Sequence, residues 1–233
     1  MNRVSVVGTV HEESGLANIT GLLAVLDRIK PEVIFLEIPS AAFDDHLSGA
    51  RSNLESTAVL RYRAIHHVDL VPVDLPTPED TFFRDNQDLF ERIERTSPEY
   101  CRLVDWHRQY VRAYGFAYLN SDHCSTLWSQ LHEATLTSIA ELGDHRLAEL
   151  YNLWQNTNEL RDKAMMTNIE NYCRRPRSVL AHFSWAPHIG SPSLTCRENG
   201  LELIPSQSNG TLPASLRRRS EHLVNSSVLK LTT

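Results

Sequence analysis

The feature that most constrains this sequence is a strand, helix, strand pattern near its beginning. Residues 3–8 (RVSVVG) form a short β-branched run that ends at a glycine, which is typical of a buried strand. Residues 18–29 then carry apolar side chains at helical spacing, and residues 33–37 (VIFLE) form a second buried run. Strands that alternate with helices indicate a parallel sheet with right-handed crossovers, so the sequence predicts an α/β fold.

A third strand and a group of long helices complete the expected domain. Residues 68–73 (VDLVPV) form a strand whose end is irregular or at an edge, because Pro72 cannot donate a backbone hydrogen bond. The pattern that follows is mostly helical, with Ser121 or Asp122 as the N-cap of one helix. The expected helices are residues 80–94, 98–114, 121–142 and 144–172. We therefore expect a small parallel sheet with a helical insertion.

The composition excludes several classes of protein. A net charge of -6 gives no general attraction to nucleic acid or to an anionic membrane surface. No apolar run reaches the roughly 18 residues that cross a bilayer, and we see no signal peptide. The cysteines are far apart and form no Cys-x-x-Cys pair, which argues against a structural zinc site and a disulfide scaffold. They are Cys101, Cys124, Cys173 and Cys196. We expect a cytoplasmic protein with no nucleic-acid or membrane partner.

Two polar residues follow the first two expected strands. His11 comes just after the first strand, in Gly8-Thr9-Val10-His11, and Glu37 ends the second strand. Ligands bind beyond the carboxyl ends of the strands of an open parallel sheet. We expect the two strands to be neighbours, so that His11 and Glu37 lie side by side there. An imidazole and a carboxylate can bind a divalent metal or act as a general acid and base, and a purely structural hydrogen bond is the alternative.

Other polar residues are weaker candidates. Asp74 ends the third strand, and its carboxylate is a candidate third site group in the same crevice, after His11 and Glu37. Glu12 and Glu13 either reach a metal beside His11 or favour the N-terminus of the following helix. We expect His66 and His67 to take surface or capping positions, and a ring directed into the crevice is the alternative. Four histidines of the helical region have no ligand spacing, and we interpret them as surface or core residues: His107, His123, His132 and His145.

The candidate residues lie in segments that resemble a known family. Gly8-Thr9-Val10-His11, a helix and then Phe35-Leu36-Glu37 are similar to the opening of the TraB/PrgY/GumN (Tiki-like) family. The likeness returns at Val71-Pro72-Val73-Asp74 and in residues 160–169 (LRDKAMMTNI), and it covers residues 3–175 with a patchy middle. This family belongs to a superfamily that includes the erythromycin esterases and the ChaN-like haem-binding proteins.

The resemblance implies a fold, a site and an activity. The fold would be α/β of the erythromycin-esterase/ChaN/TraB type, with His11 and Glu37 as metal or catalytic residues. Arg161 would orient the substrate or a carboxylate, and a solvated or salt-bridged helix arginine is the alternative. Because the Tiki members are metal-dependent proteases, we expect a hydrolase of peptide or ester bonds that uses a divalent metal (Mn, Co or Zn) on a peptide or small-molecule substrate. The pheromone-shutdown members imply the alternative, a non-catalytic binding or regulatory protein.

The chain departs from this family after residue 175. Family members carry a second Gly-x-x-His motif there, whereas residues 183–190 read FSWAPHIG. Several codons are possible for each of these residues. If the reading frame starts two bases later, a choice of these codons encodes Leu-Leu-Gly-Ala-Ala-His-Arg. Our hypothesis is that a frameshift within residues 173–183 replaced the C-terminal part. Without the second motif the chain lacks the three protein ligands usual for a catalytic metal, so an active hydrolase and an inactive chain are both alternatives.

The composition of the C-terminal part agrees with this hypothesis. Residues 174–233 carry eight Lys/Arg and three acidic residues, a net charge of +5 that leaves -11 for residues 1–173. This part is also rich in serine and proline and has no sustained apolar period, which disfavours a packed subdomain. The sequence therefore predicts a TraB-like α/β domain over residues 1–175 and a divergent, poorly packed tail over residues 176–233.

Overall fold

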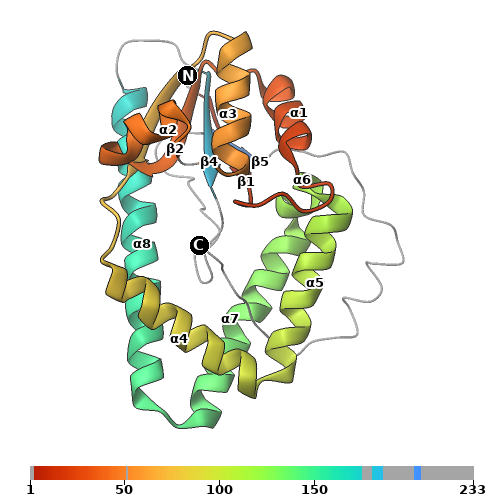
Figure 1. Ribbon diagram of the computed structural model, residues 1–233, viewed down its shortest axis with the longest axis vertical. Helices are drawn as coiled ribbons and strands as arrows, with labels where there is room; N and C mark the ends of the chain where they lie inside the picture. Colours follow the sequence, from red (N-terminus) through yellow and green to blue (C-terminus); the bar gives the residue numbers. More distant parts are fainter. Residues whose placement is uncertain (1–2, 51, 175–179, 186–201, 206–233) are drawn as a thin grey trace.

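A five-stranded parallel sheet organises the chain (Figure 1). The computed structural model describes residues 3–50, 52–174, 180–185 and 202–205. The strands are β1 (Arg3–Gly8), β2 (Val33–Pro39), β3 (Asp69–Asp74), β4 (Leu180–Trp185) and β5 (Glu202–Pro205). Their order in the sheet is β3-β2-β4-β1-β5, and every printed pairing is parallel. The expected α/β class is confirmed.

The expected pairing of the first two strands is wrong, because β4 lies between β1 and β2. Gly8 at the end of β1 pairs with Trp185 of β4, and Phe35 of β2 pairs with Phe183 from the other side. The local sequence of a strand does not specify its neighbours, which depend on where the later crossovers return. The ends of β1 and β2 are therefore separated by two strand spacings, roughly 10 Å.

Two segments of the expected tail belong to the sheet. Strands β4 and β5 both lie beyond residue 175, and β4 is in the middle of the sheet. The other residues of the stretch 176–233 lie outside the described residues, so the poorly packed tail and the domain boundary stay predictions.

Helices cover both faces of the sheet. On one face, α1 (Ile19–Ile29) and α3 (Leu54–Ile65) pack against β2, and Ile34 is buried with Leu26 and Val59. On the other face, the last turns of α8 (His145–Cys173) bury Ile169 against Phe35. Successive residues of β2 thus point to opposite helical layers, which explains why the strand is apolar on both sides. A short 3-10 turn, η1 (Ser40–Ala42), and α2 (Phe43–Ser48) follow β2.

A helical body lies beyond the carboxyl ends of the strands (Figure 1). It contains α4 (Asp80–Thr96), α5 (Pro98–Tyr114), α6 (Phe116–Leu119), α7 (Asp122–Leu142) and the first turns of α8. The side chain of Ser121 caps α7, as one of the two expected residues. This body has its own core, in which Tyr100, Leu131 and Tyr151 are fully buried. None of the described helices has the length and apolar character needed to cross a membrane.

Candidate functional site

A large pocket separates the sheet from the helical body. Its volume is about 1160 Å³, above the usual range of small-molecule sites, roughly 300–1,000 Å³. Side chains at the carboxyl ends of the strands line one end, as expected for an open parallel sheet. The polar residues predicted from the sequence all line this pocket: His11, Glu12, Glu13, Glu37, Asp74 and Arg161.

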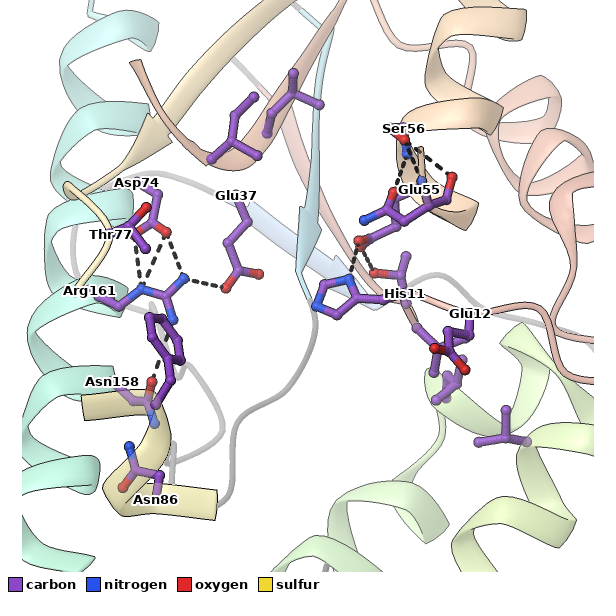
Figure 2. A pocket seen from close by; sticks show the side chains of 18 of the residues that line it. His11, Glu12, Glu37, Glu55, Ser56, Asp74, Thr77, Asn86, Asn158 and Arg161 are labelled. Atoms are coloured by element: carbon purple, nitrogen blue, oxygen red, sulfur yellow. Dashed lines mark hydrogen bonds and ion pairs between the residues drawn. The ribbon is translucent and has the colours of Figure 1, made fainter. Parts of the chain in front are cut away.

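One wall of the pocket carries a linked set of Thr9, Glu55 and His11. Figure 2 labels Glu55 and His11 of this set. The Nδ1 atom of His11 lies 2.7 Å from Oε2 of Glu55, and the hydroxyl of Thr9 donates to Oε1 of the same carboxylate. The hydrogen bond to Glu55 is the main reason that the pKa of His11 is raised, and the charges of Glu55 and Glu37 add to it. Burial and the charge of Arg161 act in the opposite direction. Glu55 therefore favours the protonated form of His11.

A backbone hydrogen bond also holds the loop of His11 close to the helix of Glu55. The amide of Leu54 donates to the carbonyl of His11 at 2.9 Å, one residue before Glu55 in the first turn of α3. Asn53 and Ser56 form a capping box that fixes the start of this helix. The side chains and the main chain thus tie the loop after β1 to the N-terminus of α3.

A buried ion-pair network forms the opposite wall (Figure 2). Arg161 of α8 donates to Asp74 Oδ2 at 2.6 Å and to Glu37 Oε1 at 3.0 Å. The three side chains are only 19%, 12% and 5% exposed for Arg161, Glu37 and Asp74. Burial lowers the pKa of Arg161, but the hydrogen bond to Asp74 and the two carboxylate charges outweigh it and raise the pKa. Asn168 of α8 donates to the Val73 carbonyl at 2.9 Å, which fixes the helix against β3.

His11 and Glu37 do not pair with each other as was expected, because each binds a partner on its own wall of the pocket. Both residues face the same pocket, but His11 binds Glu55 and Glu37 binds Arg161. Figure 2 shows the second ring nitrogen of His11 directed toward the side where Glu37 lies. The intervening strand β4 is the physical reason that the two are not side by side.

Sequence reasoning missed Glu55, the partner of His11. The two residues are 44 positions apart, and no strand or helix pattern links them. The helix that carries Glu55 was not expected, because its sequence (LESTAVLRYRAI) mixes polar and apolar residues without a clear stripe. The capping pair Asn53 and Ser56 was the one local signal that a helix starts there.

The remaining histidines take varied positions. His66 lies 3.4 Å from Asp27 and stacks on Tyr62, and His67 is exposed. His107 lines the pocket, and burial lowers its pKa to about 4. The other three histidines of the helical region lie outside the residues that line the pocket: His123, His132 and His145.

A metal site of the expected kind does not form from the described residues. Among them, no three or more His, Cys, Asp or Glu side chains are grouped so that they could hold a metal ion. Glu37 is bound to Arg161, and the contact of His11 Nδ1 with Glu55 leaves Nε2 as the one ligand atom that His11 could offer. The described ligands therefore do not fit a catalytic divalent metal, which usually needs three.

Comparisons with protein-family models, with curated proteins and with solved structures find no match to this chain.

Proposed function

We propose that the pocket hydrolyses a peptide or ester bond, with His11 as the general base. The observation that carries this proposal is the 2.7 Å contact between His11 Nδ1 and Glu55 inside the large pocket. A carboxylate at Nδ1 sets the tautomer and leaves Nε2 as the nitrogen that accepts a proton. The hydroxyl of Thr9 donates to the same carboxylate, so Thr9, Glu55 and His11 form one chain of hydrogen bonds.

The reaction follows from these positions. Nε2 of neutral His11 removes a proton from a water molecule, whose oxygen attacks the carbonyl carbon of the substrate. Glu55 stabilises the imidazolium that forms. The imidazolium then returns its proton to the leaving amine or alcohol as the bond from that group to the carbonyl carbon breaks. General base catalysis of this kind contributes about 10²–10⁴ in rate.

The opposite wall has a positioning role in this proposal. Arg161 is held by Asp74 and Glu37, so its charge is already balanced by protein carboxylates. It keeps Glu37 directed into the pocket, where a carboxylate oxygen can accept a hydrogen bond from the water or from the leaving group. The ion pairs of Arg161 support this role and equally support the alternative of a salt-bridged helix arginine.

Ester hydrolysis tests the proposal directly. With p-nitrophenyl butyrate as substrate, we expect His11→Gln to lower kcat/KM by about 10² or more. His145→Gln is the matched control, because the side chain of His145 is 97% exposed, and this variant should keep full activity. Equal rates for the wild type and His11→Gln would contradict the proposal.

Metal content tests the metal-dependent form of the same function. Stoichiometric Mn, Co or Zn in the purified wild type that is lost in His11→Gln would support it. A metal-free wild type that still hydrolyses the ester would support the base mechanism alone.

A non-catalytic binding or regulatory protein is the second candidate. The size of the pocket favours it, because 1160 Å³ accommodates a large ligand whether or not a reaction follows. Ligand binding without turnover in the wild type would favour this candidate over the hydrolase.

A further inference from the structure

We propose that His46 is a second imidazole of this pocket and hydrogen-bonds a neutral oxygen of the substrate, such as the carbonyl of the bond to be hydrolysed. This inference rests on the proposed hydrolase function and adds a residue that binds the substrate. Neither the sequence pattern nor the family resemblance singled out this histidine.

The fold brings His46 to the pocket from an unexpected element. It lies in α2, the short helix that follows β2 and the 3-10 turn. Its side chain lines the same pocket as His11 and Glu55, and the charge of Glu55 acts on it. The residue is only 8% exposed, so it is a wall of the pocket and not a surface group.

The Nε2 atom of His46 is shielded from solvent and has no hydrogen-bond partner among the described residues, so a substrate oxygen reaches it only when the ring turns toward the pocket. A buried polar atom without a partner destabilises a fold, and such atoms in native proteins call for an explanation. Two half-buried histidines are bonded: His107 lies 3.0 Å from the Tyr118 hydroxyl and His132 lies 2.6 Å from the Tyr151 hydroxyl. His123 also has an unbonded Nε2, but it packs against aromatic rings away from the pocket lining.

The charge around His46 indicates the class of its partner. Burial lowers the pKa of His46 more than the charge of Glu55 raises it, so the ring is neutral near pH 7. A neutral imidazole beside a carboxylate disfavours an anionic group, which Glu55 and Glu37 repel. A neutral carbonyl or hydroxyl oxygen satisfies Nε2 without bringing a charge into the pocket.

Two variants and one control test this role. His46→Leu removes the unpartnered nitrogen, so we expect a Tm equal to or above that of the wild type. With p-nitrophenyl butyrate, the same variant should lose about tenfold in kcat/KM, mainly through a higher KM. His46→Gln, which keeps a polar atom at the end of its side chain, should recover most of this loss. His132→Leu is the control and should lower Tm, because it leaves the buried Tyr151 hydroxyl without this partner.

The outcomes separate this inference from the proposed function. If His46→Leu unfolds at a lower temperature than the wild type, as His132→Leu does, His46 is a structural residue and the inference is wrong. It is also wrong if the wild type is active and His46→Leu has the same kcat/KM. If the wild type is no faster than His11→Gln, the proposed function fails, and the thermal comparison alone decides the case of His46.

Discussion

At Arg161, one side chain binds two carboxylates from different strands. Asp74 and Glu37 come from the ends of β3 and β2, and α8 supplies the guanidinium between them. Because all three groups are largely buried, none of them can exchange its protein partner for water at low cost. The network therefore fixes where Glu37 points.

We expect Arg161→Met to destabilise the protein by about 3–5 kcal/mol, because it leaves two buried carboxylates without their cation. Urea-induced unfolding measures this change. The matched control is Lys163→Met in the same helix: its ion pair with Glu159 is 68% and 53% exposed, and its loss should cost less than about 1 kcal/mol. If both variants lower the free energy of unfolding by a similar, small amount, the Arg161 network does not stabilise the fold.

At the scale of elements, two loops meet closely beside the pocket. The loop after His11 donates the Leu16 amide to the Arg112 carbonyl of α5 at 3.0 Å. Gly115, which follows α5, has φ 53° and ψ -134°, and a Cβ there would lie 2.5 Å from the Leu16 carbonyl oxygen. Asn120 completes the junction, because its amide group bonds both the N–H and the carbonyl of Gly8. The helical body thus sets the path of the loop that carries His11.

Gly115→Ala tests this junction. Gly143→Ala is the matched control, since Gly143 also has a positive φ of 61° but open space around its Cβ position. The control should lower the free energy of unfolding by about 1–2 kcal/mol, because the added Cβ strains the backbone and meets no other atom. We expect Gly115→Ala to lower the free energy of unfolding by clearly more than the control does. It should also lower kcat/KM, because the loop that carries His11 must move. Chemical denaturation and ester hydrolysis measure the two effects, and equal costs for the two variants would contradict the close packing.

At the scale of the whole molecule, β4 joins the two halves of the sheet. It is the strand that pairs with both β1 and β2, and it ends at Trp185, opposite Gly8. In the alternative reading frame, the glycine codon overlaps the codons of Trp185 and Ala186. The frameshift hypothesis thus predicts a second Gly-x-x-His that begins where β4 ends, as the first one begins where β1 ends. Reading the gene across codons 170–195 tests it, and the absence of such a motif in any neighbouring frame would end it.

The sequence predicted the local elements well and their long-range arrangement poorly. Residues 3–8 and 98–114 are a strand and a helix with the expected bounds, because apolar period and end signals are local properties. The helix that carries Glu55 was missed for want of a clear apolar stripe, and β4 was missed because its segment lies in a polar, basic stretch. The position of β4 between β1 and β2 depends on packing of the whole chain, which no local pattern encodes.

In the site, too, the local features could be predicted from the sequence and the long-range contacts could not. Residues that follow strands were predictable, since strand ends of a parallel sheet meet at one edge, and His11, Glu37 and Asp74 do line one pocket. Their partners were not, because Glu55 reaches His11 from 44 residues away and Arg161 reaches Glu37 from 124. The TraB-like assignment and the metal-dependent activity stay predictions.

The pH dependence of kcat/KM for p-nitrophenyl butyrate, measured on the wild type and on Glu55→Gln, tests the central claim most directly. A general base works in its neutral form, so the rate should rise with pH through the pKa of His11. Glu55 raises this pKa above the ordinary histidine value of about 6.5. Glu55→Gln removes the carboxylate, so the rise should shift to lower pH and the plateau rate should fall. The same midpoint in both proteins would contradict the assignment of His11 and Glu55 as the catalytic pair.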